Sequence, residues 1–212
     1  MQPKVRLISW SSGNNIDPRR IIVLAIKTSS GALLKKSYEY YLKDYPDDKV
    51  SEWLIKAVDF PSVLEHVVFT FLIEGISRVT SHQLIRHRIA SYTQESQRYS
   101  IAEKDYVVPE TIVKKGLEDI YVSKVKELYR VYEEFINAGV PYEDARYILP
   151  QATTTRIIMT VNLRELIHIA CLRLSSKAQW EIREVVKGMI NEASKIIPEL
   201  PKMVKKGCER GI

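Results

Sequence analysis

Hydrophobic residues gather in three short segments whose pattern predicts β-strands. Residues 67–73 are rich in β-branched and aromatic side chains, which is typical of a buried strand. Residues 5–10 and 154–161 predict two further strands. The three segments lie far apart along the chain, so we expect them to meet in one small antiparallel or mixed sheet.

Helical spacing of apolar positions covers most of the remaining sequence. Asp17 followed by Pro18 is typical of a helix start, Asn162 can cap another helix, and Gly139 can end a third. The basic tail from about residue 202 is expected to be loose. We therefore predict an α+β fold with one domain over residues 1–212. The predicted helices cover residues 19–27, 33–44, 47–58, 76–88, 116–138, a short stretch after Pro141, 163–174 and 178–196.

Composition narrows the class of protein. The chain has 212 residues, of which 45% are hydrophobic and 27% charged, and this balance excludes a disordered chain. The formal net charge of +6 favours anionic partners: nucleic acid, a membrane surface or phosphorylated small molecules. Cys171 lies in an apolar helical pattern and Cys208 in the basic tail, so no disulfide is expected. There is no signal-peptide core and no apolar run of ~18 residues, so a cytoplasmic protein is expected.

Residues 86–98 carry the densest candidate chemistry. This segment holds three arginines, one histidine and two serines, and it is expected to begin at a helix end and continue as a loop. Guanidinium groups match phosphate oxygens two at a time, and hydroxyl groups can complete such a site. The segment predicts a nucleotide phosphate site. On composition alone, a basic surface loop that binds nucleic acid, with Tyr92 and Tyr99 among its arginines, fits equally well.

The predicted helix 163–174 places cations on different faces. Arg164 and His168 are four residues apart and share one face, whereas Arg173 falls on roughly the opposite side of the helix from Arg164. One pocket would use all three with difficulty. If all three contact ligands, the helix is expected to serve two pockets at a subunit interface.

Several motifs together resemble the flavin-dependent thymidylate synthases. The pattern Arg86-His87-Arg88, seven residues, then Ser96-Gln97-Arg98 resembles the signature of that family. Further segments resemble the family in the same order, so the resemblance covers about residues 60–185. These segments are residues 65–71, 145–150, 160–164 and 172–183.

The resemblance implies a homotetramer with active sites between subunits. It implies bound FAD and conversion of dUMP to dTMP, with methylenetetrahydrofolate as the carbon donor and NADPH as the reductant of the flavin. It also implies that tetrahydrofolate is released. The four histidines are scattered singly and show no metal-ligand spacing, so no metal site is expected. No nucleic-acid or membrane partner is expected either. A cysteine nucleophile is not required by this chemistry.

The resemblance also assigns roles to individual residues. Arg173 matches the arginine that activates the uracil ring by stabilising negative charge on it. The expected FAD contacts are Ser62, Arg86, His87, Arg88, Gln94, Asn162, Arg164 and His168. The expected dUMP contacts are Gln83, Arg86, Gln94, Glu95, Ser96, Gln97, Arg98, Arg146 and Arg173.

Two positions depart from the family pattern. Phe60 stands where many members have a histidine at the entrance for folate, and Thr93-Gln94 replaces the Asn-Glu of many members. Two other functions compete with the synthase: a nucleic-acid-binding protein without enzymatic activity, and a flavoprotein reductase that has lost methyl transfer.

Overall fold

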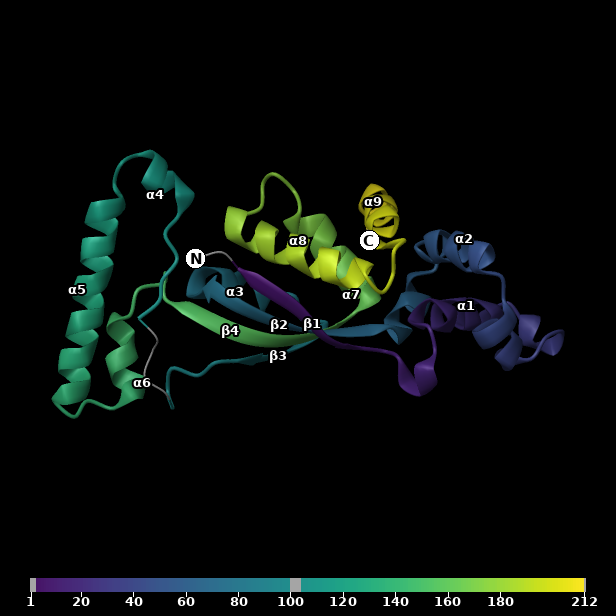
Figure 1. The fold of residues 1–212 in the computed structure, drawn as a ribbon, viewed down its shortest axis with the longest axis horizontal. Helices are drawn as coiled ribbons and strands as arrows, with labels where there is room; N and C mark the ends of the chain where they lie inside the picture. Colours follow the sequence, from purple (N-terminus) through teal and green to yellow (C-terminus); the bar gives the residue numbers. More distant parts are fainter. Residues whose placement is uncertain (1–2, 100–103, 212) are drawn as a thin grey trace. The chain divides into compact units, whose positions relative to one another are not determined.

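The computed structural model describes residues 3–99 and 104–211, which form an α+β fold around a four-stranded sheet (Figure 1). The strand order is β1-β2-β4-β3. The strands are β1 (Lys4–Trp10), β2 (Val68–Ser77), β3 (Ala90–Gln94) and β4 (Thr154–Asn162). The predicted α+β class with a small sheet is confirmed.

The central pair of strands, β2 and β4, is antiparallel. The N–H of Leu163 donates to the carbonyl of Val67 at 2.8 Å, and at the other end the N–H of Arg78 donates to the carbonyl of Thr153 at 3.1 Å. Between them the hydroxyls of Thr70 and Thr160 lie 3.0 Å apart. Alternate residues of both strands are buried, as the period of two in a strand requires.

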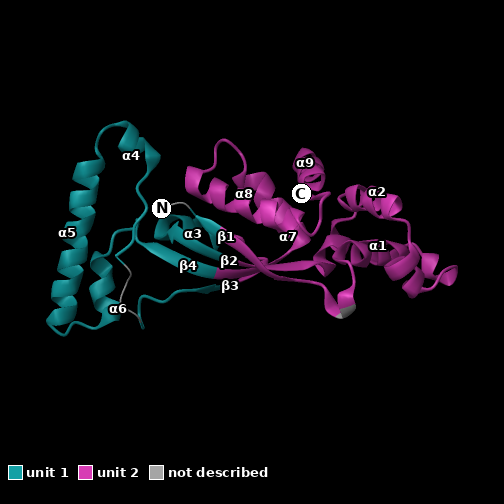
Figure 2. Cartoon of the chain, viewed as in Figure 1, with its two compact units in different colours: residues 1–4, 73–86, 93–157 teal, residues 5–72, 87–92, 158–212 magenta. Residues whose placement is uncertain are grey.

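The described chain divides into two compact units, and the boundary passes through all four strands (Figure 2). Unit 1 comprises residues 1–4, 73–86 and 93–157, and unit 2 comprises residues 5–72, 87–92 and 158–212. No linker separates the units within the described residues, because each of the four strands continues from one unit into the other. The single domain expected over residues 1–212 stays a prediction.

Unit 2 contains five of the named helices. Its N-terminal part holds α1 (Pro18–Ser29), which begins with the predicted Asp17 cap, and α2 (Asp47–Ala57), which packs against α1. Residues 32–44 form a 3-10 turn and one π-helical turn where a continuous helix was predicted. Its C-terminal part holds α7 (Leu163–Arg173), α8 (Trp180–Ser194) and α9 (Leu200–Arg210), and α7 packs against both others.

Two glycines allow close contacts within unit 2. A Cβ atom added at Gly188 of α8 would lie 2.9 Å from Cγ2 of Val5 in β1. A Cβ atom added at Gly207 of α9 would lie 2.7 Å from Cγ2 of Ile167 in α7. Both distances are too short for a real side chain, so these glycines let α8 approach the sheet and α9 approach α7.

The C-terminal segment corrects two predictions. Residues expected to form a loose tail form α9, whose buried face consists of Leu200, Met203, Val204 and Gly207. Cys171 and Cys208, expected to stay apart, form a disulfide between α7 and α9 with a Cα–Cα distance of 5.0 Å. Apolar residues at spacings of three and four give α9 a hydrophobic face. Because this face packs against α7, Cys208 comes close enough to Cys171 to form the disulfide.

Unit 1 is built around α5 (Glu118–Asn137). Its buried face includes Tyr129, whose hydroxyl donates to the carbonyl of Asp105 and contacts the hydroxyl of Thr153, each at 3.0 Å. Tyr132, one turn further along, packs against Ala145. These contacts fix the short helix α6 (Tyr142–Ala145) and the 3-10 turn Arg146–Ile148 that follows it.

Residues 76–98 differ from the sequence-based prediction. The predicted helix 76–88 is shortened to α3 (Arg78–Leu84), because β2 continues to Ser77. Part of the predicted loop is strand β3, which pairs with β4. A further short helix, α4 (Glu110–Lys114), was not predicted. Among the described residues, no helix is long and apolar enough to cross a membrane.

Candidate active site

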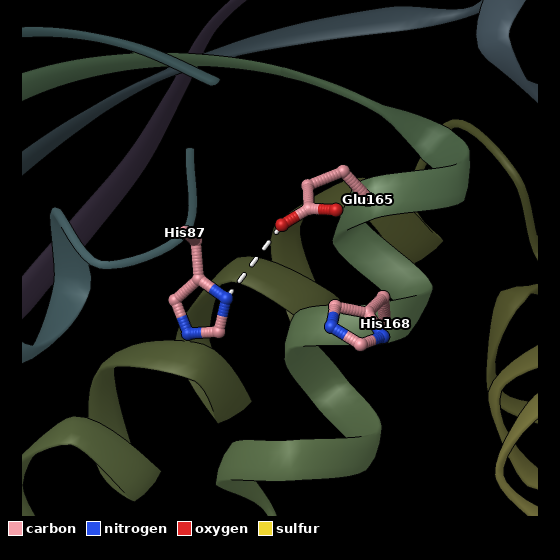
Figure 3. Close-up of side chains that lie close together, drawn as sticks. All are labelled: His87, Glu165 and His168. Carbon is pink, nitrogen blue, oxygen red and sulfur yellow. Dashed lines mark ion pairs between the residues drawn. The ribbon is translucent and has the colours of Figure 1, made fainter. Parts of the chain in front are cut away.

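A buried histidine forms the centre of the site in unit 2. His87 follows α3 and lies against α7, from which Glu165 and His168 approach it (Figure 3). The helix is set in place by Asn162, whose Oδ1 accepts a hydrogen bond from the N–H of Glu165 at 2.9 Å. The imidazoles of His87 and His168 lie edge to face, with centroids 6.4 Å apart.

Arg173, at the end of α7, makes a direct hydrogen bond to His87. Its Nε–H donates to Nε2 of the imidazole at 3.0 Å. A guanidinium can only donate, so Nε2 carries the lone pair and His87 is neutral. Burial, followed by the positive charges of Arg173 and His168, lowers the pKa of His87 from 6.5 to about 4. The ring therefore accepts from Arg173 throughout the neutral pH range.

Glu165 lies on the other side of the same imidazole. Its Oε1 is 3.6 Å from Nδ1 of His87, and the residue is only 7% exposed (Figure 3). Burial raises the pKa of Glu165, although His168 and Arg164 oppose that shift. Sequence reasoning missed this residue, because Glu165 looks like a solvated helix residue until the segment after α3 folds against it.

His87, Glu165 and His168 also form a set of side chains that divalent metals accept, with ligand atoms within 4.8 Å of one another. Arg173 places a permanent positive charge against the same ring. That charge opposes a second cation in the cluster. The absence of a metal from the mechanism stays a prediction.

The other residues of unit 2 with an expected flavin role lie in separate surroundings. Arg164 donates from Nη1 to Oε1 of Glu65 at 2.6 Å, so it faces away from the Arg173 bond, as the helix geometry predicts. Arg88 is exposed. Ser62 lines a cavity of about 450 Å³ with residues of α1 and with His66. The ring of His168 lies beside that of His87, another residue with an expected FAD role.

In unit 1, the segment after β3 is held by polar contacts to its neighbours. Nε2 of Gln94 donates to the hydroxyls of Ser81 and Thr155 at 3.2 and 3.3 Å. Glu95 lies 3.7 Å from Arg156. The hydroxyl of Ser96 accepts from the N–H of Arg98 at 3.1 Å, which tightens the turn that carries Arg98.

Two arginines of unit 1 with an expected dUMP role converge on one residue. Arg98 forms an ion pair with the carboxylate of Glu143, and Nε of Arg146 donates to the backbone carbonyl of Glu143 at 3.0 Å. Gln83 lies on α3 and is half-buried, as is Gln97, whereas Arg86 is exposed. The structure thus brings Arg98 and Arg146 together.

Arg78, at the start of α3, is a cation that the sequence analysis missed. Burial and the positive charge of Arg146 lower the pKa of Arg78, and Glu95 opposes the shift. Its Nη1 is buried and has no hydrogen-bond partner within the described part of the chain. Two neighbouring guanidiniums that repel each other are stabilised by an anion between them. The guanidinium groups of unit 1 therefore offer a site suited to an anionic ligand.

Comparison with known proteins identifies the family. The family described as thymidylate synthase complementing protein matches residues 12–199. The flavin-dependent thymidylate synthase of Sulfolobus acidocaldarius is 41% identical over 210 residues, which cover 97% of this chain and 78% of that protein. The enzyme of the same name from Saccharolobus solfataricus is 42% identical over 209 residues, covering 96% and 77%. The chain therefore belongs to the flavin-dependent thymidylate synthases, and the resemblance inferred from sequence is confirmed.

Solved structures match the fold at lower sequence identity. A UMP/dUMP methylase, PolB from Streptomyces cacaoi, bound with 5-Br dUMP, has a TM-score of 0.82 at 21% identity, covering 96% of this chain and 95% of that one. Thymidylate Synthase X from Helicobacter pylori with FAD and dUMP has a TM-score of 0.73 at 23% identity, covering 93% and 96%. These similarities support the fold over 96% and 93% of this chain, respectively.

Proposed function

We propose that this chain converts dUMP to dTMP, with methylenetetrahydrofolate as carbon donor, FAD as cofactor and NADPH as its reductant. The proposal rests on family membership together with one observation: Arg173 is fixed by the neutral ring of His87, and its Nη groups have no acceptor among the described residues. When bound, reduced FAD supplies the hydride.

Arg173 acts on the uracil ring in this proposal. C5 of uracil must become nucleophilic before it can form the new bond, and this requires negative charge to build on the pyrimidine ring and its oxygens. A permanent cation stabilises that charge best when it is already oriented. The bond from Nε to His87 orients the guanidinium and leaves both Nη groups to the uracil. Because His87 is neutral, the ring adds no second positive charge beside Arg173.

The phosphate of dUMP is held by the cations of unit 1. Arg98 and Arg146, which converge on Glu143, supply forked donors, and Ser96 supplies a hydroxyl. We add Arg78 to this set, because its buried Nη1 lacks a partner and an anion would relieve its repulsion from Arg146. Gln83, Arg86, Gln94, Glu95 and Gln97 complete the proposed contacts to dUMP.

The donor set of unit 2 fits an anionic flavin cofactor. Arg88 offers an exposed guanidinium, Asn162 an amide nitrogen that its capping bond does not use, and Ser62 a hydroxyl at a cavity. We assign FAD contacts to these residues and to Arg86, His87, Gln94, Arg164 and His168. A homotetramer with active sites shared between subunits is part of the proposal. The cytoplasmic location stays a prediction.

Product analysis tests this function. Purified protein loaded with FAD is supplied with NADPH, dUMP and deuterium-labelled methylenetetrahydrofolate, and the nucleotide is examined by mass spectrometry. Labelled dTMP supports the synthase. A flavin that NADPH reduces without any dTMP formation identifies a reductase instead, and a protein that takes up no FAD contradicts the proposal.

A further inference from the structure

We propose that Glu165 is a positioning residue that acts through His87 on Arg173. The three residues form what we call the support triad: carboxylate, imidazole and guanidinium in a row (Figure 3 shows the first two). The inference rests on the proposed function, since it assigns Glu165 to the support of the residue that activates uracil.

The geometry fixes the direction of each contact in the triad. Nε2 of His87 accepts from Arg173 at 3.0 Å, so the single ring proton is on Nδ1. Nδ1 faces Oε1 of Glu165 at 3.6 Å, and both side chains are largely buried, with residues 6% and 7% exposed. A carboxylate beside Nδ1 favours this tautomer, as a carboxylate does behind a metal-bound or catalytic histidine.

Loss of the carboxylate charge changes which nitrogen of the His87 ring carries the proton. An amide in place of Glu165 can donate to Nδ1, which moves the ring proton to Nε2. Two N–H groups, from Arg173 and His87, then face each other, and the hydrogen bond that orients the guanidinium is lost. Because Arg173 keeps its charge and its place on α7, substrate binding changes little while orientation during the reaction suffers.

Glu165→Gln is the variant that tests the triad. We expect kcat for dTMP formation to fall on the order of tenfold to a hundredfold, with little change in the KM for dUMP and in FAD retention. Glu181→Gln is the matched control, because Glu181 is another carboxylate of unit 2 that is only 2% exposed. Any general cost of replacing a buried carboxylate appears in both variants as a lower melting temperature.

The position of the proton on the His87 ring is a second readout. It would not change if Glu165 only stabilised the fold. The chain has four histidines, so selective ¹⁵N labelling of histidine gives few signals, and His87→Gln identifies those of His87. Spectra are recorded at neutral pH with and without FAD. We expect a protonated Nδ1 and an unprotonated Nε2 in the wild type and in Glu181→Gln, and a proton on Nε2 in Glu165→Gln.

Each outcome decides the proposal. A wild-type ring protonated at Nε2 or at both nitrogens overturns the triad. So does an unchanged tautomer in Glu165→Gln, whether its activity is retained or falls only in step with Glu181→Gln. If the wild type makes no dTMP, the proposed function fails, and the ¹⁵N spectra still decide whether Glu165 sets the His87 tautomer.

Discussion

Nε of Arg173 donates a hydrogen bond to Nε2 of His87 across 3.0 Å and 86 positions of sequence. The bond joins the Arg-His-Arg motif to the end of α7. It explains why a histidine in an arginine-rich segment is buried and neutral, since only a neutral ring can accept from a guanidinium. The relationship makes His87 a support for the cation that we expect to act on uracil.

Replacement of Arg173 by alanine tests that assignment. Arg173→Ala removes an oriented cation that stabilises charge in the transition state, so we expect dTMP formation to fall by on the order of 10²–10³-fold. The visible spectrum of the bound FAD is expected to stay intact. Steady-state product formation and absorption spectra provide the measurements.

The matched control for this substitution is Arg130→Ala. Arg130 lies on the surface of α5, where its guanidinium is 3.8 Å from Glu134. An exposed pair of this kind contributes little, so activity should match that of the wild type. Normal turnover by Arg173→Ala would show that the activating cation has been assigned wrongly.

Arg88 is expected to retain the flavin. Arg88→Ala removes an exposed guanidinium from the proposed FAD site, so the dissociation constant for FAD should rise about tenfold, as the loss of a charge-assisted hydrogen bond predicts. Titration of the apoprotein with FAD measures this change. Lys187→Ala, on the exposed face of α8, serves as the control, and equal affinities in the two variants would remove Arg88 from the site.

The lowered pKa of His87 predicts a pH dependence of stability in the apoprotein. In the unfolded chain His87 takes up a proton near pH 6.5, but in the folded protein it does so only near pH 4, because burial and then Arg173 and His168 disfavour the charged ring. As the pH falls from 6.5 to 4, the unfolded state therefore binds more protons and the free energy of unfolding decreases. His87 contributes at most about 1.4 kcal/mol per pH unit to this slope, and nothing above pH 6.5.

Urea unfolding of the wild type and of His87→Gln at pH 7.5, 6 and 5 isolates that contribution. All measurements use one protein concentration. As the pH falls, the free energy of unfolding should decrease more in the wild type than in His87→Gln. Parallel pH profiles would mean that His87 is not held neutral in the fold.

The disulfide between Cys171 and Cys208 predicts a large effect on stability. It closes a loop across 37 positions, for which loop-closure entropy gives about 4 kcal/mol. Cys208→Ser should lower the free energy of unfolding by about this amount, and a reducing agent should destabilise the wild type but leave the variant unchanged. Equal melting temperatures with and without reductant in the wild type would contradict the bond.

Sequence patterns predicted those helices and strands that depend on neighbouring residues alone. Helix α7 and its Asn162 cap follow from an apolar stripe and a capping residue, and β4 follows from alternation. Helix α9 has the same kind of apolar stripe, but the prolines and lysines of this segment led us to predict a loose tail. Strand β3 could not be recognised, because its polar residues become a strand only by pairing with β4.

Some residues of the candidate site could likewise be predicted from sequence motifs, and others could not. Motifs gave Arg98, Arg146, His87 and Arg173, and the structure brings the first two around Glu143 and the last two into one hydrogen bond. Glu165 and the cysteine pair were missed, because their environment depends on residues distant in sequence. Arg78 was missed for a related reason, since its unpartnered nitrogen is visible only once α3 is packed.

The most direct test of the account is a single turnover without oxygen. The enzyme with its FAD already reduced is mixed with dUMP and methylenetetrahydrofolate, and nucleotide and folate products are quantified against flavin oxidation. We predict one dTMP and one tetrahydrofolate for each flavin oxidised. Formation of dihydrofolate, or oxidation of the flavin without dTMP, would contradict the account.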